Sequence, residues 1–153
     1  MFTETLERQS QAVMDVVHER PKPISSRTHA ILDYMTVAKM LVIPRIFGAK
    51  PAVKNAVTAV ALTKLAYAML TDHEGGIVRK IPLKTHLVLD SIGGAGLAAI
   101  PFLLDEDNPM VTWSLVAIGL FDIAAAPMTQ TNEDYATQLE CWAGFRPTID
   151  DEI

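Results

Sequence analysis

Four long apolar stretches occupy the middle of the chain, and polar segments flank them. The stretches are 31–47, 52–70, 87–104 and 110–128. Each holds about 17 to 19 residues, the lower part of the range that a helix needs to cross a hydrocarbon core of about 30 Å. Their apolar residues lie on all faces, which is typical of helices that are buried or face lipid. The pattern predicts an all-α fold with four transmembrane helices.

The connections between these stretches predict two helical hairpins. Segments 48–51 and 105–109 contain Gly, Asp, Asn and Pro and are too short for anything but antiparallel neighbours. A longer polar loop, 71–85, separates the hairpins. We therefore expect a polar, amphipathic segment 1–23, a membrane domain 24–130 and a polar acidic tail 131–153. The domain would consist of two repeats, 24–72 and 81–130.

The two hairpins are copies of each other. Residues 27–47 match residues 84–104 at an offset of 57, and the offset becomes 58 beyond the turn. Uncommon residue types recur, in the pairs Thr28/Thr85, His29/His86, Asp33/Asp90 and Pro44/Pro101. Because each copy has two spans, both copies lie the same way up, and the expected relation is a pseudo-twofold axis along the membrane normal.

This repeated pattern resembles the SPW-repeat family of small bacterial membrane proteins over residues 24–130. The resemblance rests on His-x-x-x-Asp at the start of a span, an apolar stretch, a proline-containing motif, a turn and a second span. The family's Ser-Pro-Trp tripeptide corresponds here to Ile43-Pro44-Arg45 and to Ile100-Pro101-Phe102. The resemblance implies a membrane hairpin fold and no established activity.

Composition and charge exclude several classes of protein. The net charge of −5, without a basic stripe, argues against binding to nucleic acid. A single cysteine, Cys141, excludes an intrachain disulfide and a cysteine-based metal cluster. We find no catalytic constellation, no phosphate-binding loop and no Cys/His cluster, so neither an enzyme nor a metal site is predicted.

The location follows from hydropathy and from the distribution of Lys and Arg. Six basic residues lie on the side of the N-terminus and central loop and three on the other. This bias predicts an integral protein of the bacterial inner membrane with both termini cytoplasmic. A soluble four-helix bundle is the alternative, because Asp33 and Lys39 interrupt the first span.

Charged residues inside the spans are the candidate functional groups. They are Asp33, Lys39, Lys64, Asp90 and Asp122. A charge near the bilayer centre costs about 2.5–3.5 kcal/mol, so we expect all five to face inward in one polar network. Positions 64 and 122 correspond in the repeat, which predicts an ion pair between Lys64 and Asp122.

His29 and His86 extend this network, since each lies four residues before an Asp on the same helix face. The face of the third span continues through small residues that allow close helix packing. The predicted packing residues are Gly93, Gly94, Ala98, Pro44 and Pro101.

Three explanations of the network remain open. It could fix helix register, it could carry protons or other ions, or His29 and His86 could be the axial ligands of a b-type haem. The first explanation predicts no cofactor. It leads to our main hypothesis, a non-catalytic accessory or assembly subunit of a membrane complex. Its expected partners are the lipid bilayer and other membrane subunits or further copies of the chain.

Overall fold

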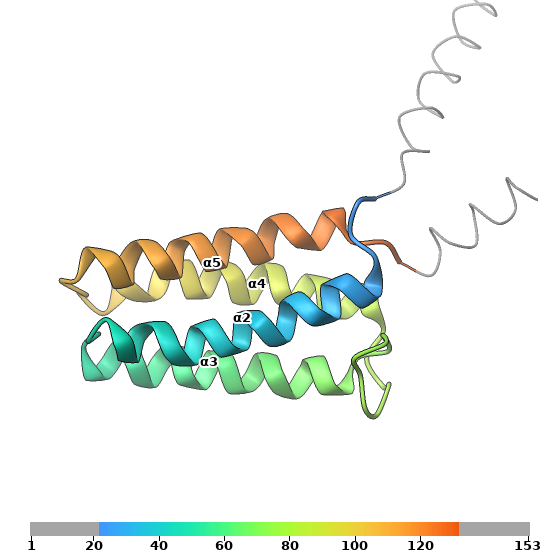
Figure 1. Cartoon of the computed structure of the whole chain (residues 1–153), viewed down its shortest axis with the longest axis horizontal. Coiled ribbons are helices and arrows are strands. Elements are labelled where there is room, and N and C mark those ends of the chain that lie inside the picture. The colour runs from blue at the N-terminus through green and yellow to red at the C-terminus, as the bar shows by residue number, and fades with distance from the viewer. Residues whose placement is uncertain (1–21, 132–153) are drawn as a thin grey trace, which may run out of the picture.

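The computed structural model describes residues 22–131, which form four α-helices (Figure 1). They are α2 (Ser26–Ile46), α3 (Pro51–Leu70), α4 (Leu83–Leu103) and α5 (Pro109–Met128). Within this range there is no β-strand, which confirms the all-α prediction. The predicted amphipathic segment and nearly all of the acidic tail, including Cys141, lie outside the described residues.

Helices α2 and α4 begin four or five residues before the apolar stretches do. Ser25 caps α2, and its side chain accepts a hydrogen bond of 3.1 Å from the backbone N–H of Thr28. The added first turns bring His29 and His86 inside the helices. Hydropathy alone misplaces these starts because the first turns are polar.

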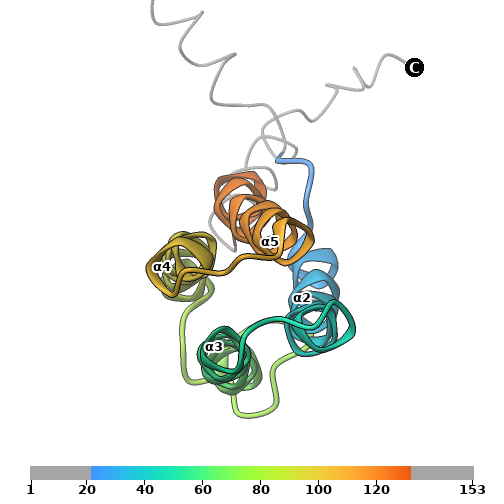
Figure 2. The same ribbon diagram turned by 90° about the vertical axis from the view of Figure 1, so that its left-hand side faces the viewer.

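The four helices form a ring in the order α2, α3, α4, α5 (Figure 2). Each helix packs against its two neighbours in this ring. Helices α2 and α4 therefore face each other across the centre, as do α3 and α5. Equivalent helices of the two repeats occupy opposite corners, so equivalent inward side chains can meet in the middle.

The repeat is visible in backbone contacts outside the helices. Ile24 pairs with Thr129 after α5, and the equivalent residue Ile81 pairs with Thr71 after α3. The same two hydrogen bonds occur at each place. Ile24 N–H to Met128 O (3.1 Å) matches Ile81 N–H to Leu70 O (2.9 Å), and Gln130 N–H to Ile24 O matches Asp72 N–H to Ile81 O, both at 2.8 Å. These contacts close the ring of helices at one end.

The buried core of the opposite half of the bundle is apolar. It includes Met40, Val53, Leu97 and Leu115, each at most 1% exposed. The buried prolines also match, since Pro44 O accepts from Ala49 N–H and Pro101 O accepts from Glu106 N–H, both at 2.8 Å. The bundle is thus divided along its length into an apolar half and a polar half.

Helices α4 and α5 pack through a contact between two glycines. A Cβ atom added to Gly94 would lie 2.5 Å from Gly119 O, and one added to Gly119 would lie 2.3 Å from Gly94 O. Ala98 also adjoins Gly119, so the predicted small-residue face does pack. The equivalent positions in α2 and α3 are Val37 and Ala61, so the contact between glycines has no counterpart in the first hairpin.

Two of the helices, α4 and α5, are long and apolar enough to cross a membrane. The exposed side chains of α5 include Trp113, Leu120 and Phe121. Helices α2 and α3 fall short of the same measure. Helix α2 carries four charged residues, among them Lys39, and the two lysines of α3 lower its hydropathy. The prediction of four helices is confirmed, and two of them have the length and apolar composition that a membrane span requires.

Candidate functional site

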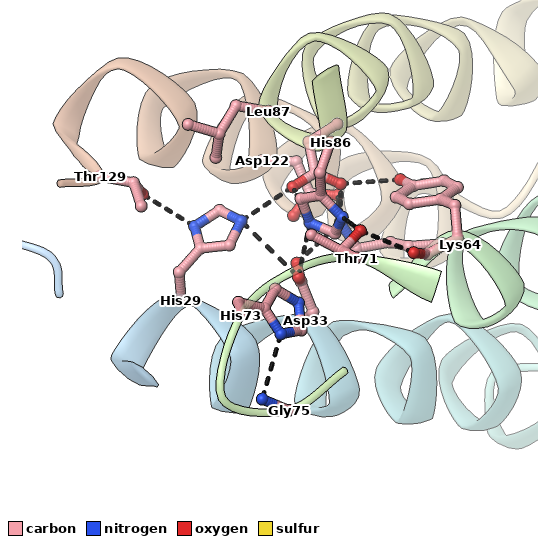
Figure 3. Close-up of polar contacts among 12 residues, drawn as sticks. His29, Asp33, Lys64, Thr71, His73, Gly75, His86, Leu87, Asp122 and Thr129 are labelled. Carbon is pink, nitrogen blue, oxygen red and sulfur yellow. Dashed lines mark hydrogen bonds and ion pairs between the residues drawn. The ribbon is translucent and has the colours of Figure 1, made fainter. Parts of the chain in front are cut away.

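All four helices contribute a charged or titratable side chain to the polar half of the bundle (Figure 3). We call this group the polar core. Every member is at most 6% exposed. The polar core consists of His29 and Asp33 from α2, Lys64 from α3, His86 and Asp90 from α4, and Asp122 from α5.

The histidines and aspartates pair across the bundle. His29 Nε2 lies 2.9 Å from Asp90 Oδ2, and His86 Nε2 lies 2.8 Å from Asp33 Oδ2. The contacts within each helix are longer, 3.6 Å for His29 and Asp33 and 3.1 Å for His86 and Asp90. The i, i+4 spacing correctly placed each pair on one helix face, but the shortest contacts join α2 to α4.

A threonine orients each imidazole from behind. Thr71 Oγ lies 2.8 Å from His86 Nδ1, and Thr129 Oγ lies 2.8 Å from His29 Nδ1. Each hydroxyl donates its one hydrogen to a carbonyl one turn earlier, Tyr67 O at 2.7 Å and Ala125 O at 2.8 Å. Each threonine must therefore accept from an Nδ1–H group, which leaves Nε2 of a neutral ring with a lone pair facing the carboxylates.

Lys64 is the only lysine or arginine in the polar core, so any other positive charge there requires a protonated histidine. The Lys64 ammonium lies 3.0 Å from Asp33 Oδ1 and 3.3 Å from Asp122 Oδ2, and it donates a hydrogen bond to Asp90 Oδ1. The ion pair predicted between Lys64 and Asp122 is therefore present. Lys64 contacts the Oδ1 atoms of Asp33 and Asp90 and leaves their Oδ2 atoms to the imidazoles.

Two further side chains complete the surroundings. The Tyr67 hydroxyl donates to Asp90 Oδ1 at 2.7 Å. His73, in the loop after α3, lies edge-on to His86 with ring centroids 5.4 Å apart. Its Nε2 is the one buried side-chain polar atom in residues 22–131 without a hydrogen-bond partner. Burial, together with the neighbouring His86, lowers the pKa of His73.

The prediction that Lys39 belongs to the network is wrong. Its side chain is exposed on the outside of α2. It follows Asp33 by six residues, which at about 100° per residue places it roughly 120° away around the helix. Of the predicted packing residues, Gly94, Pro44 and Pro101 are buried, while Gly93 is only partly covered and has Tyr67 as its neighbour.

The polar core does not fit a haem. Two axial histidines must hold their Nε2 atoms on opposite sides of one iron, with the porphyrin between the rings. Here the His29 and His86 rings meet edge-on, with centroids 5.4 Å apart. Both Nε2 atoms are in contact with carboxylates at less than 3 Å. The geometry leaves no place for a macrocycle.

Sequence reasoning missed Thr71, Thr129 and Tyr67. A signal existed for the threonines, because they match at the offset of 58 that aligns the second helices. Tyr67 has no such signal, since Ala125 takes its place in the second repeat.

Comparisons with family models, with curated proteins and with solved structures find no match for this chain. The resemblance to the SPW-repeat family therefore stays a prediction.

Proposed function

We propose that this chain is a non-catalytic membrane protein that spans the bilayer four times and serves as an accessory or assembly subunit. Along the middle of the helices, the charged side chains other than Lys39 are buried, and many large apolar side chains are exposed, the reverse of a soluble bundle. With 20 or 21 residues each, the helices have the length of a hydrocarbon core of about 30 Å. The axis relating the two hairpins would then lie along the membrane normal.

The charges that make α2 and α3 less apolar are largely compatible with this placement. Asp33 and Lys64 are buried against each other and never face the exterior of the bundle. Arg45, close to the end of α2, donates to Leu41 O and to Thr58, so its head group lies near an interface. Lys39 is the exception.

The exposed side chain of Lys39 is the observation that carries the accessory role. Within residues 22–131 it makes no hydrogen bond or ion pair. Its neighbours one turn away on the same face, Met35 and Val42, are 49% and 48% exposed. An ammonium on such a face costs about 2.5–3.5 kcal/mol in lipid, a cost that a carboxylate or carbonyl on an adjoining helix would remove. We propose that a partner helix covers this face of α2.

Proton or ion conduction, the alternative, receives less support from the packing. The polar core ends where the apolar half begins, and Met40, Leu97 and Leu115 fill the bundle axis there. No chain of titratable groups continues through that half of the described helices. The polar core therefore joins the helices in one half of the bundle without forming a path along it.

Two experiments test this proposal. Membranes washed with alkaline carbonate should retain the protein. An impermeant thiol reagent should label Cys141, the only cysteine, only after the inner membrane has been opened. Recovery in the supernatant of broken cells without detergent would refute the membrane placement.

The partner face is tested with a photo-crosslinking amino acid at position 35. A crosslinker in place of Met35 should capture a protein, either another subunit or a second copy, and Lys39→Met should abolish the capture. The matched control places the crosslinker at Trp113, which is 65% exposed on α5. Equal capture from both positions would contradict a specific partner for α2.

A further inference from the structure

We propose that the polar core binds one divalent transition-metal ion of the zinc class, with His29, Asp33, His86 and Asp90 as its ligands. The sequence predicts no metal site, because the residues come from two distant segments without a metal-binding spacing. The structure brings one ligand atom from each of these four residues within 4.8 Å of the others. The inference does not depend on where the bundle is located.

The four ligand atoms form a closed ring in which nitrogen and oxygen alternate. Around this ring the distances between Nε2 and Oδ2 atoms are 2.9, 3.1, 2.8 and 3.6 Å. Because all four atoms lie within 4.8 Å of one another, the centre of this ring lies about 2.0–2.4 Å from each corner, close to the length of zinc–nitrogen and zinc–oxygen bonds. The cation therefore fits without a large movement of the helices.

The hydrogen bonds of the threonines point to the same conclusion. Thr71 and Thr129 each accept from Nδ1–H, so each Nε2 presents a lone pair to an aspartate oxygen. Two lone-pair atoms at 2.8 or 2.9 Å repel each other unless a proton or a metal ion lies between them. An imidazole whose far nitrogen is fixed by a hydrogen bond is the usual form of a metal-binding histidine.

The charge of the polar core is suited to a divalent ion. Three carboxylates and the Lys64 ammonium leave two negative charges when both imidazoles are neutral. Because uncompensated charge is costly in a buried site, this layer requires two additional protons or one divalent cation. Lys64 contacts the Oδ1 atoms of Asp33 and Asp90, so it does not block the Oδ2 atoms that line the ring.

The ligand set favours zinc-like ions over calcium or magnesium. Hard cations such as Mg²⁺ and Ca²⁺ prefer six or more oxygen ligands, whereas imidazole suits Zn²⁺, Fe²⁺ and related ions. Four protein ligands in a closed, buried ring correspond to a structural site rather than a catalytic one. A bound ion would connect α2 to α4, the diagonal pair that has no direct helix packing.

The test uses the full chain, purified in mild detergent and stripped with a chelator. Addition of Co²⁺ should produce the visible absorption bands of tetrahedral cobalt at a ratio of one ion per chain, and Zn²⁺ should abolish them. Zn²⁺ should also raise the melting temperature, because an ion that binds only the folded state stabilises it. Absence of both effects in the folded wild-type protein would overturn the proposal.

Matched variants establish the location of the site. Asp33→Asn should abolish the cobalt bands, and Thr129→Val should weaken binding about 10- to 100-fold, as expected for loss of a residue that orients a ligand. Asp105→Asn, the same change at an exposed carboxylate outside the polar core, should keep the bands. Unchanged binding in Asp33→Asn, or loss in Asp105→Asn alone, would refute the assignment. The wild-type measurements stand even if a variant fails to fold.

Discussion

Exchange of the charges at positions 64 and 122 is a direct test of the symmetry of the polar core. Lys64→Asp removes the buried ammonium and places a fourth carboxylate beside three others. Removal of one partner from a buried ion pair costs about 3–5 kcal/mol, and the added repulsion makes this a lower bound. We therefore expect Lys64→Asp to lower the free energy of unfolding by at least about 3 kcal/mol.

The double variant, Lys64→Asp with Asp122→Lys, should recover most of this loss. The two positions are equivalent in the repeat, and Asp33 and Asp90 exchange places under the same relation. A lysine at position 122 would thus reach the same two carboxylates that Lys64 now contacts. The total charge of the layer is unchanged, so we expect a coupling free energy of at least about 2 kcal/mol between the two sites.

The assay is unfolding of the detergent-solubilised protein, followed by circular dichroism, for wild type, both single variants and the double variant. Lys64→Met serves as the control that removes the charge without adding another. The reasoning is refuted if the double variant is no more stable than Lys64→Asp alone. Such a result would mean that the surroundings of position 122 differ too much from those of position 64.

Three other predictions concern stability. Gly94→Ala should destabilise the protein by about 1–3 kcal/mol, because the added Cβ would lie 2.5 Å from a backbone oxygen of α5. Gly96→Ala is the control: the space around Gly96 is open, so the better helix propensity of alanine should stabilise the protein by up to about 1 kcal/mol. Ser26 donates to both oxygens of Glu74, at 2.9 and 2.7 Å, and thereby lowers the pKa of that exposed carboxyl. Ser26→Ala should therefore lower the free energy of unfolding by less than about 1 kcal/mol above about pH 5. Melting measured as a function of pH should show this difference between wild type and variant disappear as the pH falls through the folded-state pKa of Glu74. Asp105 has a φ of 49°, a left-handed backbone conformation that costs a non-glycine residue about 1 kcal/mol. Asp105→Gly should therefore raise the melting temperature, and an unchanged or lower melting temperature would contradict this explanation.

The sequence predicts much of this fold because the hairpins are simple and repeated. Apolar length located all four helices, and short turns fixed their antiparallel pairing. The repeat also correctly placed Lys64 opposite Asp122. These features depend on position along the chain, which periodicity and self-comparison reveal.

The remaining features depend on how each helix is rotated about its own axis. The crosswise pairing of His29 with Asp90, and the exposure of Lys39, follow from that rotation. A chain that is apolar on all faces carries little information about it, because no polar stripe marks the outside. The hydrogen bonds that Thr71 and Thr129 accept from the two histidines also depend on where the helices end. These ends lie in polar turns that hydropathy does not recognise.

The backbone pairing at Ile24 has a consequence for how the protein arose. It holds the start of the first hairpin against the end of the second. The pairing of Ile81 with Thr71 likewise holds the start of the second hairpin against the end of the first. A circular permutant that begins at Gly76, with a short linker joining 131 to 22, should therefore keep every helix contact, and two separately expressed hairpins should reassemble. Such an arrangement suggests an ancestral homodimer of one hairpin, in which positions 64 and 122 were necessarily identical. A single chain that holds both hairpins can carry lysine at one position and aspartate at the other, a combination that no symmetric dimer can encode.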